Sequence, residues 1–194
     1  MATGAIVLPA GSAGAGAALH VTHWLPEGAP KAVVLLAHGY AEHAGRYAHV
    51  AKRLTDAGYA LYAVDHWGHG KSDGQGGFVP RFSAFTDGMA ELLTLVEINH
   101  AGVPRLLLGK EFMDAMDAAQ AGAPAIRLPI LIQHGEADRL TAPQGSRFLF
   151  EHVGSKDKRL EIYPGLFHEI YNEPERDAVL ADLVGWFDAH VAKG

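Results

Sequence analysis

Three short segments of this 194-residue chain carry residue types that can move a proton or hold a developing negative charge. The first, residues 38–47, reads HGYAEHAGRY, the second ends at Asp138 and the third ends at His168. A backbone N–H presented at a His-Gly turn can stabilise the oxyanion that forms when a carbonyl group is attacked. An Asp can orient an imidazole and stabilise its cation while the His shuttles the proton. Together the segments favour hydrolytic chemistry at a carbonyl group.

Each segment follows a predicted β-strand, and these strands are residues 32–37, 128–133 and 159–163. The run at 32–37 is apolar throughout, which is typical of a strand covered on both faces. The remaining pattern predicts strands at 19–24, 59–64 and 105–108, and helices at 46–57, 82–99, 111–121, 144–153 and 175–191. Strands that alternate with helices predict a parallel α/β sheet with right-handed crossovers. Ligands bind such sheets beyond the carboxyl ends of the strands, where all three segments lie.

Hydrophobic spacing predicts which helical residues face the core. In the helix at 82–99 the inward residues are predicted to be Phe85, Met89, Leu92, Leu93 and Val96. In the closing helix at 175–191 they are predicted to be Val179, Leu180, Leu183 and Trp186.

Asp138 and His168 also have structural explanations. An Asp after a strand most often forms a turn or caps a helix. A His in a glycine-containing loop is usually just solvated, and this chain has 12 histidines. The catalytic interpretation is favoured because the His-Gly turn, the Asp and the His occur together in this order.

The combination resembles the monoacylglycerol lipase and lysophospholipase group of α/β-hydrolases, which are serine hydrolases. The segments that carry the resemblance are HGYAEHAGRY at 38–47, DHWGHGKSDG at 65–74, HGEAD at 134–138, YPGLFH at 163–168 and NEPE at 172–175. The similarity runs from about residue 19 to the C-terminus and implies a single α/β-hydrolase-like domain over residues 1–194.

The resemblance also implies an activity and residue roles. It implies hydrolysis of monoglycerides or similar acyl esters in lipid metabolism, through an acyl-enzyme intermediate and with no metal or organic cofactor. The Tyr40 N–H would be one oxyanion donor, Asp138 the acid of the triad and His168 its base. Glu42 and Arg46 would help to shape the polar end of the site, where a glycerol head group would lie.

The nucleophile segment of that family is missing from the sequence. In the family a strand leads into the elbow Gly-His-Ser-Met-Gly-Gly, a helix, a further strand and a lid. Here VPRLLLG at 103–109 is followed directly by KEFMDA, which resembles the helix after the lid. We therefore expect an α/β-hydrolase-like, mostly parallel sheet flanked by helices and shortened by loss of the elbow helix, one interior strand and the lid. The junction is predicted near Gly109 and Lys110.

One G-x-S-x-G string remains, at Gly70-Lys-Ser72-Asp-Gly74. A nucleophile elbow needs a strand before the serine and a helix directly after it. Glycines at 74, 76 and 77 oppose a helix here, so Ser72 is predicted to be a loop serine. Ser12, Ser83, Ser146 and Ser155 lie outside any elbow-like setting.

Loss of an interior strand predicts a change at the sheet edge. The strands at Arg105 and Leu128 would become either neighbours in a smaller closed sheet or exposed edges that pair with a second chain. We expect either the closed sheet or a homodimer with swapped strands.

Composition excludes several other functions. A net charge of −6 gives no basic footprint for nucleic acid, and the absence of cysteine excludes disulfides, thiolate metal sites and a cysteine nucleophile. His38 with His43, or His66 with His69, lack the further ligands of a metal site. No apolar stretch has the length of a transmembrane segment, and the N-terminus lacks a signal-peptide pattern. These features predict a cytoplasmic protein.

Three functions remain open. The first is an ester hydrolase of the monoacylglycerol lipase type whose nucleophilic serine is absent from the chain. The second is a catalytically inactive α/β-hydrolase remnant that acts as a binding or interaction module. The third is catalysis with the serine supplied by a second polypeptide.

Overall fold

The computed structural model describes residues 2–9, 18–79, 83–109 and 123–191. The predicted helix at 111–121 and the Lys110 side of the predicted junction lie outside these residues. The chain divides into two compact units, residues 1–112 and 113–194, and each unit is described by itself. The predicted single domain stays a prediction, and the division falls three residues after Gly109, close to the predicted junction.

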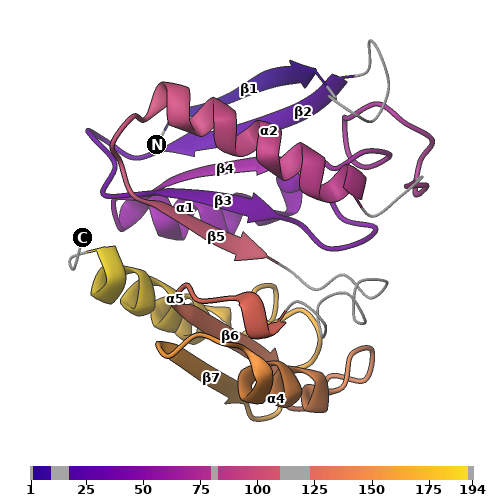
Figure 1. The fold of residues 1–194 in the computed structure, drawn as a ribbon, viewed down its shortest axis with the longest axis vertical. Coiled ribbons are helices and arrows are strands. Elements are labelled where there is room, and N and C mark those ends of the chain that lie inside the picture. The colour runs from indigo at the N-terminus through magenta and orange to yellow at the C-terminus, as the bar shows by residue number, and fades with distance from the viewer. Residues whose placement is uncertain (1, 10–17, 80–82, 110–122, 192–194) are drawn as a thin grey trace. The chain divides into compact units, whose positions relative to one another are not determined.

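The first unit contains a five-stranded sheet with the order β1-β2-β4-β3-β5 (Figure 1). Its strands are β1 (Ala2–Pro9), β2 (Ala18–Leu25), β3 (Val33–Ala37), β4 (Ala60–Val64) and β5 (Arg105–Gly109). The predicted parallel arrangement is present in β4-β3-β5, where Leu35 lies opposite both Tyr62 and Leu107. β2 is antiparallel to β4 and to β1, a strand that the sequence analysis did not predict.

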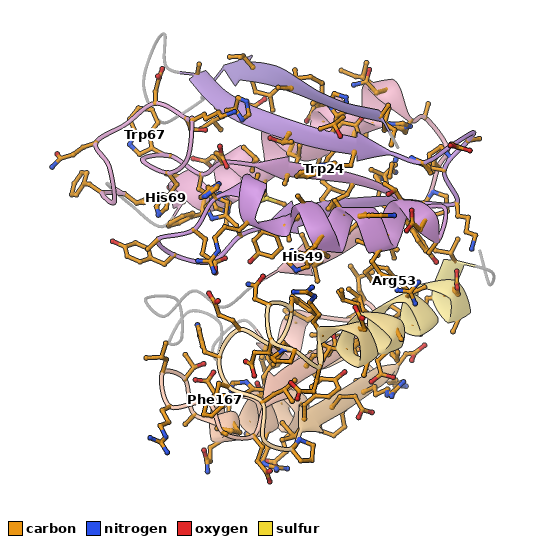
Figure 2. All side chains as sticks on the ribbon, turned by 180° about the vertical axis from the view of Figure 1, so that it is seen from behind. Trp24, His49, Arg53, Trp67, His69 and Phe167 are labelled. Carbon is orange, nitrogen blue, oxygen red and sulfur yellow. The ribbon has the colours of Figure 1, made fainter. Side chains whose placement is uncertain are left out.

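Two helices cover the faces of this sheet. Helix α1 (Ala48–Asp56) and helix α2 (Ser83–Asn99) lie on opposite faces, as Figures 1 and 2 show from the two sides. Every residue of β3 and β4 is buried, as expected for continuous apolar strands covered on both sides. On the α2 side the core includes Leu35, Tyr62, Leu92 and Val96.

The helix boundaries follow local signals. A 3-10 turn, η2 (Ala44–Tyr47), occupies the start of the helix that was predicted from Arg46, so α1 itself begins at Ala48. The chain leaves α1 through Gly58, whose φ of 90° is a left-handed conformation that glycine adopts without strain.

The predicted core faces are partly correct. In α2, Phe85, Leu92 and Val96 are buried, and Met89 packs partly buried against the core. Leu93 was wrongly predicted to face inward and is exposed. In α5 (Arg176–Val191), Val179, Leu180 and Leu183 are buried, while Trp186 is only partly buried and its ring lies 3.9 Å from that of His190.

The second unit is built on a parallel pair of strands, β6 (Ile130–Gly135) and β7 (Lys158–Tyr163). Helix α4 (Pro143–His152) connects them and packs on one face of the pair, while α5 lies on the other. β6 extends two residues beyond its predicted end, because His134 and Gly135 continue the ladder opposite Ile162 and Tyr163. A short 3-10 turn, η4 (Ala123–Ala125), precedes β6.

The described strands form two sheets, with β5 in the first and β6 in the second. Because β5 and β6 belong to separate units, the closed sheet in which the strands at Arg105 and Leu128 become neighbours stays a prediction. Within the second unit, α4 is the crossover helix between the parallel strands β6 and β7. Within the described residues, no helix combines the length and apolar character needed to cross a membrane.

Candidate active site

The Asp138 carboxylate lies in the loop after β6 and is almost fully enclosed, with 3% of its side chain exposed. Its Oδ1 accepts hydrogen bonds from the backbone N–H groups of Leu140 at 2.8 Å and Thr141 at 3.1 Å. Its Oδ2 accepts one from the Thr141 hydroxyl at 2.8 Å. Burial raises the pKa of this carboxyl, but the hydrogen bonds it accepts outweigh that effect and lower its pKa to about 2. It is therefore an anion at neutral pH.

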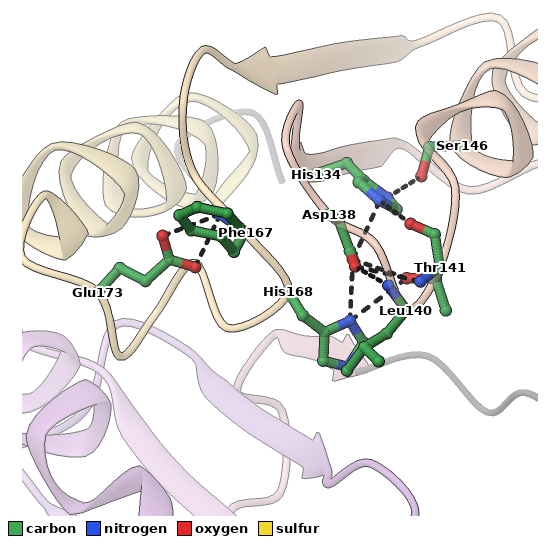
Figure 3. Close-up of polar contacts among 8 residues, drawn as sticks. All are labelled: His134, Asp138, Leu140, Thr141, Ser146, Phe167, His168 and Glu173. Carbon is green, nitrogen blue, oxygen red and sulfur yellow. Dashed lines mark hydrogen bonds and ion pairs between the residues drawn. The ribbon is translucent and has the colours of Figure 1, made fainter.

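His168 lies in the loop after β7, with its ring against this anion (Figure 3). Its Nδ1–H donates to Asp138 Oδ2 at 2.8 Å, and the Thr141 hydroxyl oxygen lies 3.3 Å from the same nitrogen. The side chain of His168 is 27% exposed, and its Nε2 makes no hydrogen bond to any described residue. The geometry therefore holds one ring nitrogen on a carboxylate and leaves the other able to exchange a proton.

Gly135 lets the two loops approach closely. A Cβ on this residue would lie 2.0 Å from the Phe167 carbonyl oxygen and 2.5 Å from that of Leu166. Instead, the Leu166 carbonyl accepts a hydrogen bond from the Ala137 N–H at 2.8 Å, and the Tyr163 carbonyl accepts one from Glu136 N–H at 2.9 Å. The backbones of the two loops are thus joined directly beside the Asp138–His168 pair.

A carboxylate holds the histidine loop from its other side. Both oxygens of Glu173 accept the Phe167 N–H, at 2.9 and 3.0 Å (Figure 3). Beneath the loop, the Gln133 side chain donates to the Tyr163 hydroxyl and accepts from the Tyr171 hydroxyl at 2.8 Å. These contacts fix the backbone from which His168 projects.

A second histidine, which was not predicted from the sequence, lies beside the carboxylate. His134 Nε2 lies 3.3 Å from Asp138 Oδ2 and donates to the Thr141 carbonyl at 3.0 Å. Because a carbonyl can only accept, Nε2 carries a proton, and Nδ1 on the other side of the ring is hydrogen-bonded to the Ser146 hydroxyl at 2.7 Å. The four-residue spacing of His134 and Asp138 was the available signal.

The His-Gly turn lies in the first unit, at the end of β3. The Glu42 N–H donates to the Gly39 carbonyl at 3.3 Å and closes the turn, within which Ala41 has a φ of 61°. The Tyr40 hydroxyl donates to the Gly77 carbonyl at 2.8 Å and ties the turn to the glycine-rich loop. Among the described residues, the Tyr40 backbone N–H has no acceptor.

Glu42 lies beneath this turn and is buried. Its Oε2 accepts from the Gly39 N–H at 3.2 Å and from the Tyr47 hydroxyl at 2.6 Å, while Oε1 lies 4.0 Å from the Arg46 guanidinium. The carboxylate thus supports the backbone that presents the Tyr40 N–H. A role for Glu42 and Arg46 toward a substrate stays a prediction.

Ser72 has the loop setting that its sequence predicts. Its hydroxyl donates to the Asp65 carbonyl at 2.5 Å and accepts from the His20 N–H at 2.8 Å. No helix follows it directly, because residues 73–79 are turns and bends. The hydroxyl therefore joins the glycine-rich loop to β2 and β4, and it is not placed at a nucleophile elbow.

Three histidines pack together behind the His-Gly turn. The ring of His38 lies 4.3 Å from that of His66 and 5.5 Å from that of His69. Burial, together with the charges that His38 and His69 would carry, lowers the pKa of His66 to about 2. Burial also lowers the pKa of His38. Within the described residues, no group of three or more His, Asp or Glu side chains is arranged to hold a metal ion.

The sequence is similar to known hydrolases over most of its length. Residues 28–110 and 108–175 match the family described as "Serine aminopeptidase, S33". The monoacylglycerol lipase of Mycolicibacterium smegmatis is 30% identical over 257 positions, which cover 87% of this chain and 92% of that protein. The monoglyceride lipase of Rattus norvegicus is 23% identical over 266 positions, covering 90% of this chain and 88% of that protein.

Both alignments are longer than the chain's 194 residues, so each relative has internal positions without a counterpart here. Among solved structures, a soluble variant of monoglyceride lipase from Saccharomyces cerevisiae in complex with a substrate analog has a TM-score of 0.76. It is 17% identical, and the match covers 91% of this chain and 93% of that one. This likeness is one of fold.

Proposed function

This chain belongs to the serine aminopeptidase family of hydrolases, and from that premise we propose that it derives from a carboxylic ester hydrolase that acts on monoglycerides or similar acyl esters. Its relatives include monoacylglycerol lipases, and its fold is a shortened form of the α/β-hydrolase fold. The observation that carries the proposal is the 2.8 Å contact between His168 Nδ1 and the buried Asp138 carboxylate.

In the proposed mechanism His168 is the base and Asp138 is the acid that orients it. His168 Nε2 takes the proton from a serine hydroxyl as the serine oxygen attacks the ester carbonyl, and then gives the proton to the leaving alcohol. Water hydrolyses the acyl-enzyme by the same two proton transfers in reverse order. The ionised state of Asp138 supports this role, because an anion stabilises the imidazolium that forms between the transfers.

We assign the Tyr40 N–H as one donor to the oxyanion. Its lack of an acceptor among the described residues supports this assignment, as does the Glu42 carboxylate that holds the turn. A glycerol head group would lie near Arg46, whose guanidinium can donate to hydroxyl oxygens.

The nucleophilic serine of this mechanism is, in our proposal, absent from the chain. Two findings support a loss near Gly109: the family match divides at residues 108–110, and the relatives carry extra internal positions. The hydrogen-bonded loop setting of Ser72 supports it further. The missing segment would have contained the elbow, its helix, one strand and the lid.

Restoring that segment tests the proposal directly. We expect that inserting the corresponding segment of the Mycolicibacterium smegmatis relative after Gly109 gives a protein that hydrolyses monoacylglycerols and is labelled by a fluorophosphonate. The matched control is the same insertion with alanine at the elbow serine, which should lose both properties. Intact mass of the natural protein provides the preceding check, since a mass well above 20.7 kDa would show that the serine segment is present.

A second candidate function is a non-catalytic binding module. It is favoured by the commitment of the Ser72 hydroxyl to two structural hydrogen bonds. In that case the natural chain binds acyl esters or a partner protein without being labelled by a fluorophosphonate. A restored variant that also fails to form an acyl-enzyme would favour this function over the first.

We also propose that the chain forms a homodimer through its sheet edges. β5 ends the five-stranded sheet, and within the described residues it pairs with β3 alone. Leu107, at the middle of β5, is 70% exposed. An apolar edge strand of this kind favours pairing with a second chain, including an exchange of strands.

A further inference from the structure

The second unit retains an acid–base pair that makes no contact with a nucleophilic side chain among its described residues. His168 Nδ1 is held by Asp138, and Nε2 on the opposite side of the ring is free of described partners and reached by solvent. An imidazole in this state can act as a general base toward water as well as toward a hydroxyl side chain.

The hydroxyl groups of this unit are all committed elsewhere. From residue 113 onward the sequence has three serines and threonines, namely Thr141, Ser146 and Ser155. Thr141 donates to Asp138 on the Nδ1 side of the His168 ring, Ser146 bonds His134, and Ser155 donates to the Asp157 carbonyl. The chain also has no cysteine. The two tyrosine hydroxyls of the unit donate to Asp182 and Gln133. No hydroxyl or thiol of the unit is therefore available as a nucleophile at Nε2.

We propose that the Asp138–His168 pair activates a water molecule and hydrolyses small activated esters without an acyl-enzyme. His168 Nε2 takes one proton from water while the water oxygen forms a bond to the ester carbonyl carbon. The bond from that carbon to the leaving oxygen then breaks, giving a carboxylic acid and an alkoxide or phenoxide. The leaving oxygen, or the solvent, recovers the proton from the imidazolium, and the base is regenerated.

The substrate class follows from what this pair supplies. It provides a base and an anion that orients that base, but no acid other than the imidazolium to assist the leaving group. Aryl and enol esters release stabilised phenoxide or enolate anions and need little such assistance, whereas alkyl esters such as monoglycerides release alkoxides and need more. The inference rests on the part of the proposed function that assigns the base and its orienting acid, and it does not require a serine.

Aryl acetate hydrolysis by the natural full-length chain tests the inference. We expect steady turnover without an initial burst, slower in D₂O than in H₂O, at a rate about 10²-fold above that of the His168→Ala variant. Asp138→Asn should lose most of this excess rate. The control is His152→Ala, which removes an exposed imidazole on α4 of the same unit and should keep the rate.

Three results would overturn the inference. The first is a His168→Ala rate equal to that of the natural chain, because the hydrolysis would then come from the other imidazoles. The second is a burst with a stable added acyl group in the intact mass, which indicates a covalent nucleophile. The third is transfer of the acyl group to an added amine, together with equal hydrolysis rates in H₂O and D₂O. Such a result indicates that the imidazole attacks the ester directly.

The outcome is separable from that of the proposed triad. Suppose that the restored insertion variant forms no acyl-enzyme, but the natural chain hydrolyses aryl acetates and loses this activity in His168→Ala. That result would support this inference and contradict the triad. If the insertion variant is acylated and the natural chain shows no excess hydrolysis, the triad is supported and this inference is contradicted.

Discussion

At the scale of single residues, Asp138 stays ionised despite its burial. Each of its oxygens accepts two hydrogen bonds, and the resulting low pKa makes it a fixed negative charge beside His168. A carboxyl whose pKa is lowered by folding stabilises the native state above its unfolded pKa of 3.8, and this stabilisation is lost as the pH falls toward about 2. The contribution at neutral pH is about 2 kcal/mol.

Replacing the hydroxyl donor should weaken this effect. We expect Thr141→Val to raise the Asp138 pKa by about one unit, because one of its four hydrogen bonds is lost while burial is kept. Carbon-13 NMR titration of the carboxyl measures the change. Thr141→Ser keeps the donor and should titrate as the natural protein does; an unchanged pKa in the valine variant would show that the hydroxyl contributes nothing.

The buried histidines predict that the free energy of unfolding of the first unit falls at acid pH. Because the pKa of His66 is about 2 in the folded state, the unfolded chain binds a proton below its ordinary pKa of 6.5 while the native state does not. Stability is therefore complete above pH 6.5 and falls below it, by up to about 1.4 kcal/mol per pH unit for this one residue. The lowered pKa of His38 acts in the same direction.

Denaturant unfolding followed by the fluorescence of the buried Trp24 should show this loss between pH 7 and pH 5. His66→Gln removes the titrating group and should flatten the slope in that window. If this variant does not fold, NMR of the natural protein still tests the prediction, because a His66 ring that becomes protonated between pH 7 and pH 5 would contradict it.

At the scale of secondary structure elements, the site depends on how closely the loops after β6 and β7 approach. We expect Gly135→Ala to lower the free energy of unfolding by about 2 kcal/mol or more, because its Cβ would meet the backbone carbonyls of Leu166 and Phe167. The same shift should weaken the Asp138–His168 hydrogen bond, seen as a change in the His168 imidazole NMR signals.

The control for this prediction is Gly185→Ala in α5, where a Cβ meets no atom within 4 Å. That change should be neutral or stabilise by about 1 kcal/mol through helix propensity. Equal effects of the two substitutions on thermal unfolding would show that the close approach at Gly135 has no special importance.

The elements were predictable where a local pattern determines them. Side-chain burial determines the apolar strands β3 and β4, and backbone conformation determines the end of α1 before Gly58. Each of these lies within about two residues of its predicted position. β1 was missed because it pairs antiparallel with β2 at the sheet edge, and its burial is set by that partner. Leu93 was misplaced because helical spacing gives a face but not its width.

In the candidate site, too, some features were predictable from the sequence and others were not. The order of Asp138 and His168, each after a strand, was visible in the sequence, and the structure brings the two side chains into contact. The contacts of His134, Thr141 and Ser146 were not visible, because they depend on side-chain directions within one short loop and the start of α4. Glu42 was expected near a substrate, and its bonds to Gly39 and Tyr47 appear only in the folded turn.

At the scale of the whole molecule, the position of β5 at the end of its sheet predicts self-association. We expect the natural chain to be a dimer by light scattering at micromolar concentration, and Leu107→Lys to weaken the dimer about tenfold or more, ~1.4 kcal/mol. The matched control is Ile98→Lys, since Ile98 is 75% exposed but lies on α2 rather than on a strand. A monodisperse natural monomer would contradict the prediction.

The crossover from β6 through α4 to β7 has a consequence for the order of folding. Asp138 and His168 are only 30 positions apart, and the strands that carry them pair through one short connection. The first unit pairs β3 with β4 over a similar separation, but its sheet is complete only when Val21 pairs with Val64 and Val33 pairs with Arg105. Contacts over shorter separations form faster, so we expect the β6–β7 pair to assemble before the five-stranded sheet during refolding. A chain shortened upstream of β6 would thus bring Asp138 and His168 together in an early kinetic phase, ahead of the strand pairings that close more slowly.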